Sequence, residues 1–196
     1  MSAPSLRTAG VVLVSVLVLA GCSDSSNTIA DQARAGNNKN YIAGDGSVTT
    51  ISADQRETTL DLNGTTLEGE TWTSSEALGD VLVINVWGSW CPPCRDETDD
   101  LVAVHGDFTD AGEPVQFMGV NDRDSVPTAQ AFERAHDVEY PSLEDNGGAT
   151  RADLVGLANA TPSTLVVDPQ GKVAARVNGP VSASTLRALI QDVLDE

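Results

Sequence analysis

The fold is decided by the stretch Trp87-Gly88-Ser89-Trp90-Cys91-Pro92-Pro93-Cys94. It begins at the end of the run from Val81 to Trp87, which is almost continuously apolar, as expected of a central strand that is buried on both faces. After it, Leu101, Val104 and Phe108 recur at helical spacing and predict a helix from Cys91 to about Phe108. A Cys-x-x-Cys between a buried strand and a helix is typical of a redox motif.

The two cysteines of this motif differ in their expected roles. Cys91 would lie in the first turn of the helix, where unpaired N–H groups and the positive end of the helix dipole favour the thiolate. Cys94, three residues on, returns within bonding distance and can resolve a mixed disulfide from the inner side. We therefore expect Cys91 to be the accessible nucleophile and Cys94 the shielded partner. A static structural disulfide is the alternative, and a metal site would need further ligands, whereas His105 and His136 lie outside the loop.

Composition narrows the class of protein. The 196 residues suffice for one globular domain, and 11 Lys plus Arg against 29 Asp plus Glu give a formal charge of −18. A polyanion of this kind repels nucleic acid phosphates and anionic membrane surfaces. Three cysteines leave room for one reactive pair and one odd thiol, and they exclude a disulfide-dense scaffold or a four-cysteine metal site. We expect no nucleic-acid partner, no metal and no cofactor.

Residues 1–21 predict a signal peptide. The weakly polar run from Ala9 to Gly21 has about 13 residues, which is shorter than the roughly 20 of a membrane-spanning helix. It ends in Leu19-Ala20-Gly21-Cys22, which resembles the bacterial lipobox, whose cysteine is acylated and becomes the mature N-terminus. We expect Cys22 to anchor the protein by lipid on the extracytoplasmic face of the cell membrane. The alternative is a secretory peptide in which Cys22 is incidental.

Residues 22–56 predict a tether between this anchor and a folded domain at residues 57–196. They are rich in Ser, Asn, Asp, Gly, Thr and Ala and contain few large apolar side chains. A flexible chain of this length has a root-mean-square span of about 30 Å. The segment would let the domain move over the membrane surface, or it serves only as a spacer.

The domain should open with a β-hairpin, because Asn63-Gly64 stands between the alternating segments 58–62 and 65–68. Apolar periodicity and turn residues predict the other elements. These are a strand at 115–120, a helix at 125–136, a short extended piece at 140–143, a short helix at 149–157 and two antiparallel strands at 163–167 and 173–177. Leu186, Leu189, Ile190 and Val193 form the stripe of a final amphipathic helix.

The strand, the Trp-x-x-Trp-Cys-Pro-Pro-Cys motif, the helix and the later Ala160-Thr161-Pro162-Ser163-Thr164 resemble the thioredoxin superfamily, in particular its membrane-tethered TlpA/ResA-like branch. The resemblance implies an α/β thioredoxin fold, with a central mixed β-sheet flanked by helices. It also implies that Pro162 is a cis-proline beside the redox pair and that, with Thr161, it offers backbone groups to an extended substrate. Trp87 and Trp90, just before Cys91, suit the walls of a shallow substrate groove, although both also fit as core aromatics.

Asn85 and Glu97 bear on how a proton would be transferred at the redox motif. Many thioredoxins bury an acid two residues before the first tryptophan of the motif, whereas this chain has Asn85 there, and an amide cannot shuttle a proton. TlpA/ResA-like proteins instead use a glutamate three residues after the second cysteine, which is Glu97 here. Positions i and i+3 share a helix face, so Glu97 should exchange a proton with Cys94. The alternative is a surface salt bridge within the acidic face formed by Asp96, Asp99 and Asp100.

The sequence therefore predicts a thiol-disulfide oxidoreductase with a reducing pair. The two prolines remove N–H donors that would stabilise the Cys91 thiolate, and strong oxidants depend on a very stable thiolate. The resemblance implies reduction of disulfides in exported proteins such as apocytochrome c, with electrons from a membrane thiol-disulfide transporter. The alternatives are a disulfide-forming oxidase and a binding lipoprotein with a static disulfide. A peroxide-reducing enzyme is disfavoured because Gly88 stands where such enzymes carry a threonine.

Overall fold

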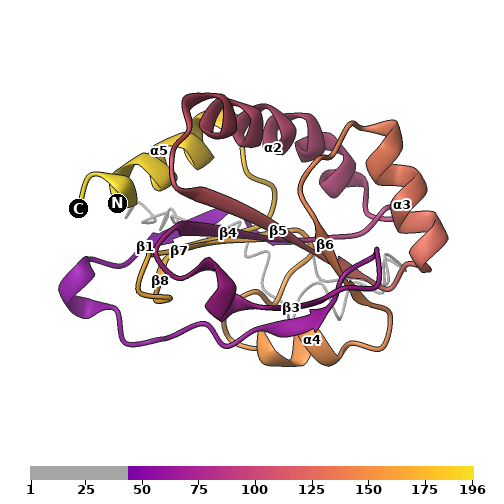
Figure 1. The fold of residues 1–196 in the computed structure, drawn as a ribbon, viewed down its shortest axis with the longest axis horizontal. Helices are drawn as coiled ribbons and strands as arrows, with labels where there is room; N and C mark the ends of the chain where they lie inside the picture. Colours follow the sequence, from indigo (N-terminus) through magenta and orange to yellow (C-terminus); the bar gives the residue numbers. More distant parts are fainter. Residues whose placement is uncertain (1–43) are drawn as a thin grey trace, which may run out of the picture.

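A six-stranded mixed β-sheet lies at the centre of the structure, a computed structural model that describes residues 44–196 (Figure 1). The strand order is β1-β8-β7-β4-β5-β6; β4, β5 and β6 run parallel, and the other neighbours pair antiparallel. The strands are β1 (Ser47–Thr50), β4 (Val81–Trp87), β5 (Val115–Asp122), β6 (Ser142–Asp145), β7 (Ser163–Val167) and β8 (Val173–Asn178). The predicted signal peptide, Cys22 and the tether up to residue 43 lie outside the described residues.

Two layers cover the sheet, and the expected α/β class is confirmed. Figure 1 shows α2 and α5 on one face and α4 with the β2–β3 hairpin on the other, while α3 lies near the β6 side. The helices are α2 (Pro92–Ala111), α3 (Val126–Ala135), α4 (Ala149–Asp153) and α5 (Ala183–Leu194), and the hairpin pairs β2 (Asn63–Thr65) with β3 (Thr71–Thr73). Two 3-10 turns, η1 (Ala53–Gln55) and η2 (Ser74–Ala77), complete the elements.

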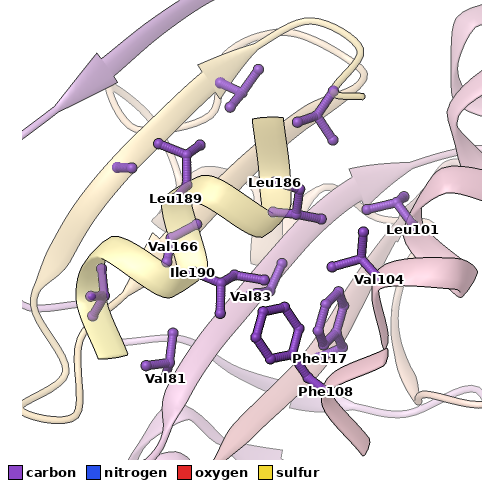
Figure 2. Packing of buried hydrophobic residues seen from close by; sticks show 14 of the residues in the cluster. Val81, Val83, Leu101, Val104, Phe108, Phe117, Val166, Leu186, Leu189 and Ile190 are labelled. Atoms are coloured by element: carbon purple, nitrogen blue, oxygen red, sulfur yellow. The ribbon is translucent and has the colours of Figure 1, made fainter. Parts of the chain in front are cut away.

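Strand β4 divides the core into two halves. All seven of its residues are buried, and because side chains alternate along a strand, Val81 and Val83 face α2 and α5 whereas Leu82 and Ile84 face the hairpin. On the first face, the predicted stripe of α5 packs on the sheet beside residues from α2, as Figure 2 shows for Leu186, Leu189 and Ile190. Each such buried aliphatic side chain stabilises the fold by about 1.5–3 kcal/mol.

The predicted hairpin turn at Asn63-Gly64 is wrong. These two residues lie inside strand β2, and the chain turns instead at residues 67–70, where Gly69 has a φ of 90°. The shifted pairing buries Leu62 and Trp72 in the second half of the core. Burial of these large apolar side chains outweighs the local preference of Asn-Gly for a turn.

The predicted tether contains residues that belong to the sheet. Strand β1 pairs with β8, and the buried guanidinium of Arg56 binds Asp168 at 3.1 Å and also the side chain of Glu196. The folded part therefore includes residues 47–56. All four residues of β1 are exposed, so this strand is held by backbone pairing at a sheet edge and has no apolar pattern that could have indicated it.

The other elements follow the sequence expectations. Strands β4 and β7 have the predicted bounds, α2 extends three residues further, and α4 ends at Asp153, four residues early. The extended piece expected at 140–143 lies at Ser142–Asp145. Among the residues from 44 onward, no helix has both the length and the apolar character needed to cross a bilayer.

Candidate active site

Cys91 and Cys94 form a disulfide at the start of α2, with Cα atoms 5.3 Å apart. Cys91 is the N-cap residue, and Pro92 and Pro93 occupy the first helical positions, where a missing N–H removes no intrahelical hydrogen bond. Both cysteines are buried in this disulfide form, so the expectation that Cys91 is accessible is not confirmed. Their order along the helix, and not their exposure, distinguishes the two sulfurs.

The loop before β7 lies against Cys91. The peptide bond between Thr161 and Pro162 is cis, which confirms the conformation expected of Pro162. The carbonyl oxygen of Thr161 lies 3.7 Å from Cys91 Sγ. A disulfide sulfur has no proton to donate, so this is a contact in the oxidised form and a place for a thiol hydrogen bond in the reduced form. Arg151 donates to the carbonyls of Ala160 and Asn159 and so holds this loop from behind.

Trp87 supports the redox motif from within the core. Its indole Nε1 donates to Ser142 Oγ at 3.2 Å, and its ring lies 5.1 Å from that of Phe132 on α3. It shares an apolar cluster with both cysteines, Leu67 and Ala129. Gly119 is required here, because a Cβ on it would lie 2.1 Å from Ser142 Oγ. Trp87 is buried, so it forms the base of the site and not the groove wall that its sequence position suggested.

Trp90 is the half-buried tryptophan of the motif. Its indole Nε1 donates to the backbone carbonyl of Asp122 at 2.8 Å, and the guanidinium of Arg123 lies 4.4 Å from its ring centroid. The ring packs so closely over Gly88 that a Cβ there would lie 2.5 Å from the indole nitrogen. Trp90 is thus fixed in orientation while part of its surface stays open beside Cys91.

Asp124 holds the backbone of the motif in place. Its buried carboxylate accepts hydrogen bonds from the Ser89 backbone N–H at 2.8 Å, the Ser89 hydroxyl at 2.7 Å and the Asn121 side-chain amide at 3.0 Å. Charge-assisted hydrogen bonds of this kind are about twice as strong as neutral ones. The loop before Cys91 is therefore attached to the segment that follows β5.

Glu97 is buried one helical turn after Cys94 and is bound from both sides. Oε1 accepts from Asn85 Nδ2 at 2.9 Å, and Oε2 accepts from the backbone N–H of Val181 at 2.8 Å. Asn85 also donates to Thr164 Oγ1 at 3.2 Å. The surface salt-bridge alternative for Glu97 is therefore wrong. Asn85 and Glu97, which the sequence analysis identified separately, are hydrogen-bonded to each other in the structure.

The environment of Glu97 suits proton transfer near neutral pH. Burial raises its pKa from 4.5 to about 7, whereas the hydrogen bonds from Val181 and Asn85 lower it and the charge of Asp100 raises it. Asp96 and Asp99 are exposed and Asp100 is half-buried, as expected of an acidic face. A carboxyl with a pKa near the working pH can both accept and release a proton.

Three contributors to the site were not identified from the sequence: Asp124, Ser142 and the backbone N–H of Val181. A signal existed for the first. Polar residues 121–124 directly follow strand β5, and the carboxyl ends of the parallel strands β4 and β5 meet at one edge of the sheet. Ser142 and Val181 are far from the motif in the sequence and contact it only in the folded protein, so no local sequence pattern indicates them.

We predict that Asp124→Ala destabilises the protein by about 1–3 kcal/mol, because it leaves the half-buried donors of Ser89 and the buried amide of Asn121 without an acceptor. Asp124→Asn should lose much less stability, because its amide oxygen can accept from the Ser89 N–H while its amide nitrogen donates to the Ser89 hydroxyl. Denaturant unfolding checks this, with Asp110→Ala on the exposed face of α2 as control. Equal stability of Asp124→Ala and the control would contradict the role of Asp124.

Comparison with known proteins agrees with this geometry. The family model described as AhpC/TSA family matches residues 55–176. The thiol:disulfide interchange protein DsbE of Allochromatium vinosum is 33% identical over 129 residues, which cover 64% of this chain and 66% of that protein. The thiol-disulfide oxidoreductase ResA of Halalkalibacterium halodurans is 28% identical over 107 residues, covering 55% of this chain and 58% of that protein. The chain thus spans less than two thirds of these curated relatives.

A solved structure matches over a larger share. The secreted thiol-disulfide isomerase from Corynebacterium glutamicum superposes with a TM-score of 0.72 and 32% identity, and the match covers 78% of this chain and 95% of that one. The expected thioredoxin fold is confirmed, and the chain belongs to the thioredoxin-like AhpC/TSA family, among relatives of the ResA and DsbE type.

Proposed function

We propose that the protein is a thiol-disulfide oxidoreductase that reduces disulfides in exported proteins. The observation that carries this proposal is the Cys91–Cys94 disulfide at the start of α2, facing the Thr161–Pro162 loop, with the buried Glu97 one turn away. Relatives named for thiol-disulfide interchange support it. A static bridge would need neither the neighbouring loop nor a buried carboxyl with a pKa of about 7.

The reaction proceeds in two exchanges. In the reduced protein the Cys91 thiolate attacks one sulfur of the client disulfide, which forms a mixed disulfide and releases the other client sulfur as a thiolate. Cys94 then loses its proton to the Glu97 carboxylate and attacks Cys91, which regenerates the Cys91–Cys94 disulfide and frees the second client thiolate. Two electrons pass to the client, whose thiolates take up two protons. A dithiol donor must restore the pair, and we propose a membrane thiol-disulfide transporter.

Pro92 and Pro93 remove two backbone donors that could stabilise a Cys91 thiolate, which favours reduction over oxidation. Asp96 and Asp99 are exposed in the first two turns of α2, where negative charge opposes the formation of a Cys91 thiolate. A strong oxidant needs a very stable thiolate, so this environment disfavours the oxidase alternative. By resemblance to the TlpA/ResA-like branch, we propose apocytochrome c as a client class.

We predict that Cys94→Ala accumulates mixed disulfides with client proteins, whereas Cys91→Ala does not, because only Cys91 starts the exchange. Non-reducing electrophoresis of protein expressed in its own cell envelope checks this.

The reduction potential of the wild-type Cys91–Cys94 pair, measured by equilibration with glutathione, is a second test. It should lie nearer to that of thioredoxin, about −270 mV, than to that of a strong oxidase, about −120 mV. Trapping on Cys91→Ala alone, or a potential near the oxidase end, would contradict the proposal.

Glu97→Gln should slow disulfide reduction by about tenfold to hundredfold near pH 8, because the substitution removes the proton acceptor for Cys94. The new amide can keep its hydrogen bonds if Asn85 turns its own amide, so the fold should survive. The pH–rate profile should lose its rise through about pH 7, the pKa of Glu97. Asp110→Asn, an exposed change at the far end of the same helix, is the control, and superimposable profiles for all three proteins would refute proton transfer by Glu97.

The same substitution should alter the pH dependence of stability. The folded-state pKa of Glu97 is about 7 and its ordinary value is 4.5, so the folded protein binds more protons than the unfolded chain between these pH values. The contribution of this group to the free energy of unfolding therefore falls as the pH rises through that window. Glu97→Gln should flatten this part of the stability curve.

We also propose that Cys22 is acylated and holds the domain on the extracytoplasmic face of the membrane. The lipobox-like Leu19-Ala20-Gly21 before it carries this proposal. The secreted relative supports export.

Intact-mass analysis of the membrane-extracted protein should therefore find a chain that starts at Cys22 and carries a diacylglyceryl group. Cys22→Ala removes the site of acylation, so this lipid-carrying mature chain should be missing from the membrane extract. A mature chain that begins elsewhere, or one without lipid mass, would rule the anchor out.

A further inference from the structure

Arg151 binds two consecutive backbone carbonyls in the loop that leads to the cis-proline. Its Nη1 donates to the carbonyl of Ala160 and its Nη2 donates to that of Asn159, each at 3.2 Å. A guanidinium presents its donors in a rigid planar fork, so one side chain fixes both peptide groups. The next residue, Thr161, has its carbonyl oxygen 3.7 Å from Cys91 Sγ. The loop that Arg151 holds therefore ends at the redox pair.

Arg151 also ties this loop to the sheet. Asp145, at the end of β6, accepts from the backbone N–H of Arg151 at 2.9 Å and so fixes α4, from which the side chain reaches the loop. The carbonyl of Ala160 accepts in addition from Ser163 Oγ at 2.9 Å, whereas the bond to the carbonyl of Asn159 comes from Arg151. Loss of the guanidinium would therefore release the Asn159 end of the loop.

The position of the loop sets the surroundings of the Cys91 sulfur. In the reduced form, an oxygen placed like the Thr161 carbonyl accepts a hydrogen bond from the thiol, and it faces the full negative charge of the thiolate. A hydrogen bond to the neutral form and a negative partial charge beside the ionised form both favour the protonated thiol. The Thr161 carbonyl therefore opposes ionisation of Cys91.

The charge of Arg151 acts in the opposite direction, because a nearby cation favours a thiolate. Asp122 and Asp145 are both buried and attract this guanidinium, whereas Arg123 repels it. The two carboxylates thus offset the positive charge that acts on the sulfur. The carbonyl of Thr161 is in contact with the sulfur, so its position should have the larger effect.

We propose that Arg151 is a positioning residue that holds the Thr161 carbonyl against Cys91 and thereby restrains ionisation of the attacking thiol. The inference rests on the proposed function, in which Cys91 starts the exchange, and it names what limits the reactivity of that thiol. A restrained thiolate is also what a reducing pair requires, because strong oxidants depend on a very stable thiolate. The variants below leave the other charged groups around the pair unchanged, namely Arg95, Asp96 and Glu97 on α2, Asp122, Arg123 and Asp124 after β5, and Asp145 before α4.

The test measures alkylation of Cys91 by iodoacetamide in the reduced full-length protein, with mass spectrometry of the digested chain to quantify the label on this cysteine alone. Because the thiolate is the reactive form, the rate at pH 6 reports on ionisation and the rate at pH 10 reports on access. Arg151→Gln should react about threefold to tenfold faster than the wild type at pH 6, equivalent to a pKa lower by up to about one unit, and within about twofold of it at pH 10. Arg151→Lys keeps the charge but lacks the planar fork, and it should react at least about twofold faster at pH 6.

Arg176→Gln is the matched control, because Arg176 donates to the carbonyl of Gly156 earlier in the same segment, at 3.0 Å. It should react like the wild type at both pH values. The same acceleration in Arg176→Gln as in Arg151→Gln would mean that any loosening of this segment suffices, and the inference would be overturned. Circular dichroism verifies that each variant is folded, and Arg151→Lys decides alone if Arg151→Gln is not.

Three other results would also overturn the inference. A slower reaction of Arg151→Gln at pH 6 with no change in Arg151→Lys would mean that Arg151 acts through its charge. Equal acceleration at pH 6 and pH 10 would mean that the substitution only opens access to the sulfur. Unchanged rates in both variants would mean that the loop keeps its position without Arg151. The proposed function itself is wrong if Cys91 in the folded, reduced wild type is not alkylated at either pH.

Discussion

The carboxylate of Glu97 joins three distant parts of the chain one helical turn from Cys94. It is carried by α2, it accepts from Asn85 in the central strand β4, and it accepts from the backbone of Val181 before α5. These bonds hold the helix that bears the redox pair at a fixed position over the sheet. They also keep a carboxyl group in an apolar interior, where burial raises its pKa to about 7. One buried group thus belongs both to the packing of the domain and to the surroundings of the disulfide.

The rest of the site is built on the ends of the parallel strands β4 and β5. Asp124 binds the backbone of Ser89, and the carbonyl of Asp122 binds the indole of Trp90, so the loop before Cys91 is held on two sides. Trp87 supports it from the core through Ser142. Such a loop does not have to be ordered when a client binds, which lowers the entropic cost of recognition.

Much of this could be predicted from the sequence, because the signals are local. The apolar run of β4, the helical spacing of α5 and the Cys-x-x-Cys motif each report on one element, and their placement was correct. The predictions that failed concern elements whose placement is decided by tertiary packing and strand pairing and not by local sequence preference. Asn63-Gly64 lies in a strand because burial of Leu62 and Trp72 decides the register, and the exposed strand β1 is held by pairing with β8 alone. Asn85 and Glu97 were identified singly, but only the fold brings them within hydrogen-bonding distance.

The titration of Glu97 itself tests the central claim most directly. Infrared spectra of the disulfide form, recorded as a function of pH, should contain a protonated carboxyl band that Glu97→Gln lacks. We predict that this band disappears with a midpoint near pH 7, because the buried carboxyl keeps its proton until then. A midpoint near 4.5, the ordinary value for glutamate, would mean that Glu97 is solvated and cannot take the role assigned to it here.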